Sequence, residues 1–326
     1  MDVTSLNQNQ KQSKLGKIVK INVTNVIYVG VNWRMISHIL YGLMLIILIV
    51  DVSKLIKDFN LMSGLYVFLS KHIKHKRLLL SILSSMFGIL PIHGRNILSS
   101  PILKSFVTCD DKSKNRIGMI NYLTTHHYYL WSPIEKTILI PVLALPITYL
   151  QMLKYTLPIL LIMLSFILVY VFTVVKEKDI TFEPIKVDKN ERRSKWYQYI
   201  NWKLIGLLVV VMTLNWIVKS HSEYLTSIIT SATALPTATV IAFIIAFLLG
   251  SSAKFAGIVV ILTGIFGIEY LTFFIAVEFS AYLLSPMHKC IVITNEYFDT
   301  HYLYFYKITG ILTALIILTG ILSLIY

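Results

Sequence analysis

Residues 155–175 read YTLPILLIMLSFILVYVFTVV and contain no aspartate, glutamate, lysine or arginine. About 20 such residues in a helix cross the roughly 30 Å hydrocarbon core of a bilayer. The stretch therefore predicts a membrane-spanning helix. The same pattern recurs along the chain, with apolar runs at residues 36–50, 138–150, 204–218, 240–250 with 255–268, 271–284 and 308–326.

Composition indicates the same class of protein. Of the 326 residues, 56% are hydrophobic and only 14% are charged, and the mean hydropathy is +0.71. A soluble domain carries about 25% charged residues, so a soluble fold of this composition would aggregate. We predict an all-α, polytopic transmembrane protein of the cell membrane, with about eight to ten spans in the lipid bilayer.

Charge divides the chain into four parts. Residues 1–35 are polar and basic, 36–175 form a first membrane half, 176–203 a charged linker, and 204–326 a second membrane half. The net charge is +14. Lysine and arginine retain short loops on the cytoplasmic side, so we expect the linker to be cytoplasmic. Nucleic acid is not an expected partner, because no recognition module surrounds the basic residues.

The first half is interrupted at residues 90–101, LPIHGRNILSSP. Proline removes a helical donor, and the backbone groups set free must be buried in protein or face a water-filled site. The sequence predicts one break at 91–96 and another at 99–101. The alternative is a kinked helix whose serines bond to its own backbone. The candidate substrate or ion ligands here are Pro91, His93, Gly94, Arg95, Asn96, Ser99 and Ser100.

The second half is interrupted at residues 250–254 and 284–288. Paired interruptions on either side of a central linker are typical of transporters built from two inverted repeats, in which broken helices hold the substrate. The alternative is that these are ordinary loops, with His288 exposed on a turn. The second set of candidate ligands is Ser285, Pro286, His288, Thr294 and Asn295, and the candidate proton relay is His126 and Glu278.

Enzyme and metal chemistry have little support in the sequence. No nucleophile elbow, HExxH helix, phosphate-binding loop or dinucleotide fingerprint occurs. Cys109 and Cys290 are far apart, and His126 and His127 do not share a helical face as metal ligands at i and i+4 would. Glu135 is expected to be solvated at a helix start. We therefore predict no enzyme activity, no metal site and no cofactor, with an intramembrane hydrolase or lipid-modifying enzyme, or a non-transporting membrane protein, as the alternatives.

Three polar stretches, 90–101, 121–133 and 285–297, occur in an order that resembles a prokaryotic integral membrane family, the domain of unknown function 401, grouped with the ion transporter superfamily. The resemblance covers residues 36–326, and the SPMHKC element at 285–290 is its most specific piece. It implies an inverted-repeat transporter with two re-entrant hairpins. Members of that superfamily move carboxylates, arsenite or other solutes, often coupled to sodium or protons.

The expected function is secondary active transport of a small anionic solute, coupled to a sodium ion or a proton, with a second copy of the chain as a candidate partner in a homodimer. Arg95 is the reason to expect an anion, because a guanidinium near the membrane centre costs about 2.5–3.5 kcal/mol on insertion scales unless something offsets it. A bound carboxylate, an internal partner such as Glu278, or a shallow position at the interface would each do so.

Overall fold

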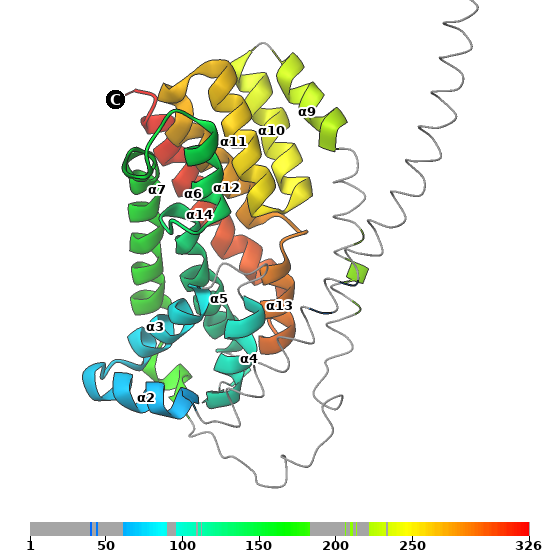
Figure 1. The fold of residues 1–326 in the computed structure, drawn as a ribbon. Coiled ribbons are helices and arrows are strands. Elements are labelled where there is room, and N and C mark those ends of the chain that lie inside the picture. Colours follow the sequence, from blue (N-terminus) through cyan, green and yellow to red (C-terminus); the bar gives the residue numbers. More distant parts are fainter. Residues whose placement is uncertain are drawn as a thin grey trace, which may run out of the picture. The chain divides into compact units, whose positions relative to one another are not determined.

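The computed structural model describes residues 40, 44, 61–89, 96–108, 110–111, 113–182, 206, 209–210, 213, 222–232 and 234–325. The chain divides into two compact units, Met1–Ile46 and Ile47–Tyr326. In the first unit only Leu40 and Met44 are described, and both are exposed. All elements discussed below belong to the second unit, which is mostly helical (Figure 1).

The elements of the first half precede the expected linker. They are α2 (Leu61–His72), α3 (Lys76–Gly88), α4 (Asn96–Phe106), β1 (Val107–Thr108), α5 (Lys114–His126), the 3-10 turn η1 (His127–Leu130), α6 (Lys136–Ala144), α7 (Tyr149–Val169) and its π-helical extension η2 (Tyr170–Val174). The start of the linker forms η3 (Glu177–Asp179) and β2 (Thr181–Phe182).

The described elements of the second half are all helical. They are α9 (Ser222–Ser231), α10 (Leu235–Leu249), α11 (Ser252–Phe266), the 3-10 turn η6 (Ile268–Tyr270), α12 (Leu271–Leu284), α13 (Lys289–Phe298) and α14 (Tyr302–Leu322).

Three segments within the described ranges are long and apolar enough to cross a membrane: Tyr149–Val174, Ile268–Phe298 and Tyr302–Leu322. The first and third expose rows of large apolar side chains, such as Leu157, Leu161 and Leu168 of α7. An exposed apolar surface of this kind suits contact with lipid. The protein is therefore a membrane protein, although three candidate spans are fewer than the eight to ten that the sequence predicts. Two further apolar helices, α10 and α11, are shorter.

Helix α12 is the centre of the second unit, and all of its residues except Phe273 and Leu284 are buried. It packs against α10, α11 and α14 (Figure 1). A helix that is apolar all round is stable only when it is covered on every side. Gly320 brings α14 close to it, because a Cβ at this position would lie 2.6 Å from the Ala276 Cβ.

The helix breaks agree with the sequence in some places and not in others. Helix α3 ends at Gly88, before the interruption predicted at 91–96, and α4 begins at Asn96, the last residue of that interruption. Helix α10 ends at a left-handed Gly250, and α12 ends before Ser285. The break predicted at 99–101 is wrong, because Pro101 lies inside α4, where the helix tolerates the loss of one hydrogen bond.

The apolar run at 138–150 does not form one span either. Helix α6 ends at Ala144, and Leu145 is extended, with φ −104° and ψ 153°. The residue before a proline is driven out of the helical region by a clash with the proline ring, and residue 146 is proline. A new helix, α7, then begins at Tyr149 behind the capping box of Thr148 and Gln151.

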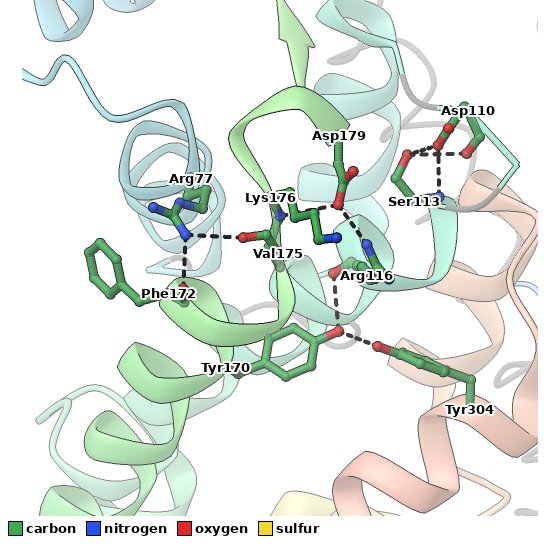
Figure 2. Close-up of polar contacts among 10 residues, drawn as sticks. All are labelled: Arg77, Asp110, Ser113, Arg116, Tyr170, Phe172, Val175, Lys176, Asp179 and Tyr304. Atoms are coloured by element: carbon green, nitrogen blue, oxygen red, sulfur yellow. Dashed lines mark hydrogen bonds and ion pairs between the residues drawn. The ribbon is translucent and has the colours of Figure 1, made fainter.

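The start of the charged linker is docked on the first half (Figure 2). Arg77 forms an ion pair with Glu177 at 3.0 Å and donates to the Phe172 and Val175 carbonyl oxygens. Arg116 pairs with Asp179 at 2.8 Å. Strands β1 and β2 pair antiparallel beside these contacts, with Val107 opposite Phe182. The linker is therefore docked on the first half from Lys176 to Phe182.

Candidate functional site

A buried polar network joins α4, α5 and α13. The Asn96 side-chain amide donates a hydrogen bond to Thr294 Oγ1, and Thr125 Oγ1 donates to Asn96 Oδ1 at 2.7 Å. All three side chains are fully buried. Asn96 is the first residue of α4, whereas Thr294 lies 198 positions later, in α13. The two halves of the chain therefore meet at this polar contact.

The network continues from α5 into α3 and the second turn of α4. The Asn121 amide donates to Ser100 Oγ at 2.8 Å and accepts from Ser84 Oγ at 2.8 Å. Thr124 Oγ1 in turn donates to Ser84 Oγ at 2.8 Å. These side chains are also fully or almost fully buried. Networks of this kind fix helices in one arrangement, because any displacement would leave a buried polar group without its partner.

A second polar group, the histidine–cysteine cluster, consists of His126, His288 and Cys290. The two histidine Nε2 atoms lie 3.1 Å apart. One nitrogen of each histidine and the Cys290 sulfur all lie within 4.8 Å of one another, and all three residues are buried. His126 is the last residue of α5, His288 directly precedes α13, and Cys290 is in the first turn of α13.

Tyrosines surround this cluster. The Tyr122 hydroxyl donates to the Leu283 carbonyl oxygen at 3.0 Å and lies 3.2 Å from His288 Nδ1. The Tyr282 ring packs 4.2 Å from the His288 ring, and the Tyr282 hydroxyl donates to the Tyr129 hydroxyl at 2.9 Å. Aromatic rings thus enclose the cluster, and two tyrosine hydroxyl groups lie close to it. Ligand-binding sites commonly combine an apolar, aromatic lining with a few polar groups in this way.

Several buried polar atoms have no hydrogen-bond partner within the described part of the chain. Both carboxylate oxygens of Glu278 in α12 are in this state, as are Ser99 Oγ and Asn295 Nδ2. Glu278 lies in a candidate membrane span and is 0% exposed. Ionisable groups at such positions are rare and mark ion or proton pathways. An ionised Glu278 would need a cation beside it, because an isolated buried charge is very costly.

The structure places the predicted site residues in several different surroundings. Pro91, His93, Gly94 and Arg95 lie outside the described residues, so their predicted roles stay predictions. Asn96, Ser100 and Thr294 belong to the buried network, and His126 and His288 belong to the cluster. The remaining five lie elsewhere: Glu278 is buried in α12 and Ser99 in α4, Pro286 is exposed, Ser285 accepts from the Met287 amide, and Asn295 accepts a hydrogen bond from Thr300.

Two expectations about burial were wrong. Glu135, expected to be solvated, is 4% exposed at the start of α6. The alternative in which His288 stands exposed on a turn fails as well, because the His288 side chain is 2% exposed and lies against Tyr122 of α5 and Tyr282 of α12. In both cases the sequence shows a polar residue beside a helix start, whereas tertiary packing decides whether water reaches it.

Sequence reasoning missed Thr125, Asn121, Tyr122 and Cys290. The sequence contains a weak indication of the buried network, since Asn121 and Thr125 are one turn apart and lie on the same face of α5. The structure explains why His126 and His127 behave differently. α5 gives way to the 3-10 turn η1 between them, so His127 contacts Ser85 and Trp131 instead of the cluster.

Comparisons of the chain with family models, with curated proteins and with solved structures found no match. The resemblance stated from the three polar stretches thus stays a prediction.

Proposed function

We propose that the protein is a multi-pass protein of the cell membrane that moves a small anionic solute by secondary active transport. The buried network of Asn96, Thr125 and Thr294 is the observation that carries the proposal. Polar side chains held inside a membrane helix bundle commonly mark the path of a solute or ion.

Two short helices support a transporter with inverted repeats. Helix α4 has 11 residues and α13 has 10, too few to cross a bilayer. Each follows a break after a longer helix, α3 in the first half and α12 in the second. The short helices pack against each other and against α5. In transporters with inverted repeats, such half-helices from the two repeats meet at the substrate site.

Two positively charged features at the start of α4, the helix N-terminus and Arg95, support an anionic solute. Asn96 is the first residue of this helix, and helix N-termini carry the positive end of the helix dipole. Arg95 precedes Asn96 in the sequence and lies outside the described residues. A carboxylate or phosphate is the ligand that both groups favour.

A thermal-shift screen of the purified protein in detergent tests the proposal, with acetate, succinate and phosphate as probes. A ligand that binds the native state raises the unfolding temperature in proportion to its affinity and concentration. Thr294→Val keeps the side-chain shape but removes the hydroxyl, so we expect at least about tenfold weaker stabilisation by the anion that binds, equal to about 1.4 kcal/mol.

Two matched variants serve as controls. Thr294→Ser retains the hydroxyl and should bind close to wild type. Thr239→Val in α10 removes a buried hydroxyl that bonds to Leu235 in its own helix, away from this network, and should leave anion binding unchanged. Equal anion stabilisation in wild type and in Thr294→Val would contradict the placement of the site. Absence of uptake of every stabilising anion into proteoliposomes would contradict transport.

The coupling ion is either a proton or sodium, and Glu278 distinguishes them. The Glu278 carboxyl group has no hydrogen-bond partner among the described residues, and such a group can carry a proton across an apolar region. Glu278→Gln imitates the protonated form permanently, so we expect anion binding to persist while uptake no longer responds to an imposed pH gradient. Uptake that responds to pH equally in wild type and Glu278→Gln, or that follows only a sodium gradient, would rule out Glu278 as the proton carrier.

A further inference from the structure

We propose that His126, His288 and Cys290 bind one transition-metal ion, Zn²⁺ or Cu⁺, between α5 and the start of α13. The ligand atoms are Nε2 of both histidines and Sγ of the cysteine. This inference goes beyond transport of an anion and does not rest on it. It is carried by the geometry of three buried ligand atoms that lie within 4.8 Å of one another, and by the hydrogen-bond partners of the two Nδ1 atoms.

The Nδ1 atom of His126 bonds to the Tyr122 carbonyl oxygen. A carbonyl oxygen only accepts, so the proton of the neutral ring is on Nδ1 and a lone pair is on Nε2. A histidine that ligates a metal is usually oriented in this way, by donation of its other nitrogen to a backbone carbonyl.

His288 has a partner that permits the same arrangement when a metal is bound. The Tyr122 hydroxyl donates to the Leu283 carbonyl in the last turn of α12, a position where carbonyls lack a helical donor. The oxygen of that hydroxyl lies 3.2 Å from His288 Nδ1 and can accept a proton held there, which would leave Nε2 to bind the metal.

The two Nε2 atoms lie 3.1 Å apart, within hydrogen-bond distance, so without a metal one imidazole donates to the other. A metal ion would take the place of the proton between them, and the donor ring would then carry its proton on Nδ1. The spacing fits, since Zn–N bonds of about 2.0–2.1 Å in a tetrahedral site place two nitrogens roughly 3.4 Å apart.

Cys290 makes the site selective for soft or borderline metals. Imidazole and thiolate together suit zinc and copper, whereas magnesium and calcium prefer oxygen. Binding forms two metal–nitrogen bonds and one metal–sulfur bond and releases the thiol proton to solvent, with no change of oxidation state. Because the three ligands are buried, the metal would be incorporated as the helices assemble.

The test uses full-length protein from cells grown with added zinc, copper or cobalt salts. We expect metal analysis to find one Zn²⁺ or Cu⁺ per chain, and the cobalt-loaded protein to show a thiolate-to-cobalt charge-transfer band in the near ultraviolet. Cys290→Ser should abolish the band. The other cysteine provides the matched control, and Cys109→Ser should retain the band.

Substitution of a ligand residue should weaken metal binding more than substitution of a residue that only orients a ligand. Tyr122→Phe removes the hydroxyl that orients His288 and should weaken metal binding about 10- to 100-fold, as loss of an outer partner does. His126→Gln and His288→Gln should weaken it further, whereas His301→Gln, at an exposed histidine, should not. Substoichiometric metal in the wild type, or a cobalt spectrum without the thiolate band, overturns the proposal even if the ligand variants fail to fold.

Discussion

Asn121 shows at the scale of one residue how much the buried network depends on complete hydrogen bonding. Its amide donates to Ser100 and accepts from Ser84, so Asn121→Ala leaves two buried hydroxyls with fewer partners. Each unsatisfied group costs about 1–3 kcal/mol, and we expect a loss of this order in the free energy of unfolding. Unfolding in detergent by a denaturant measures it, and a loss under 0.5 kcal/mol, roughly that of a neutral surface change, would show that the network is not tight.

Lys114 provides a pH-dependent contact at the residue scale. Its ammonium lies 2.6 Å from Asp299, and this hydrogen bond raises the pKa of Lys114 above its usual value of 10.5. A group whose pKa is higher in the folded state stabilises that state fully below its unfolded pKa. The contribution is therefore complete at neutral pH and is lost as the pH rises above 10.5 through the folded value.

Asp299→Asn is the matched variant for this contact. Asp299 has a φ of 50°, and asparagine tolerates this left-handed conformation well, so the substitution removes the charge with little backbone effect. We expect wild type to be the more stable of the two at neutral pH, and the difference to shrink in strong alkali and in high salt. Unfolding temperatures measured across alkaline pH decide this, and a difference independent of pH would exclude the ion pair as its source.

At the scale of elements, the close packing of α14 on α12 depends on the absence of a side chain at Gly320. Gly320→Leu would push the helices apart, because even a Cβ would lie 2.6 Å from the Ala276 Cβ and 3.3 Å from the Phe273 Cα. Small residues let membrane helices approach closely, and overpacking costs about 1–3 kcal/mol. The unfolding temperature of Gly320→Leu in detergent should fall accordingly.

Gly310, in the same helix, is the control. A Cβ there meets nothing within 4 Å, so Gly310→Ala should be neutral or stabilise the protein by about 0.4–1 kcal/mol through the unfolded state. Similar destabilisation by both substitutions would show that helix propensity, and not the contact with α12, decides the effect.

At the scale of the whole molecule, the basic residues Arg77 and Arg116 lie beside the start of the linker, where they pair with Glu177 and Asp179. Basic loops face the cytoplasm, so this end of the second unit should be cytoplasmic. In a Cys109→Ser background, a membrane-impermeant maleimide added to intact cells should not label Lys178→Cys, and opening the cells should permit labelling. Strong labelling of Lys178→Cys from outside would reverse the orientation.

The sequence by itself determined the class of the protein and the positions of the apolar helices α7, α10, α11, α12 and α14, whereas the runs at 36–50 and 204–218 lie almost entirely outside the described residues. Uncharged apolar runs as long as a bilayer is thick allow few other structures, since backbone groups in lipid must bond within their own helix. Local chemistry also determined several helix ends, as at Gly250 and before Ser285. The effect of two prolines was predicted wrongly, because a proline within an apolar run can either end a helix or be tolerated in it. Pro101 lies inside α4, whereas the run at 138–150 is divided before Pro146.

Only the tertiary structure decided which polar residues meet. Asn96 bonds to Thr294 across 198 positions, and His126 faces His288 across 162. The sequence contains no local signal for such pairs, because each polar side chain near a helix break could equally face water, lipid headgroups or a partner helix. Packing of α4 and α13 against α5 selects the partner helix, since a polar group left unpaired in the interior costs more than the contact itself contributes.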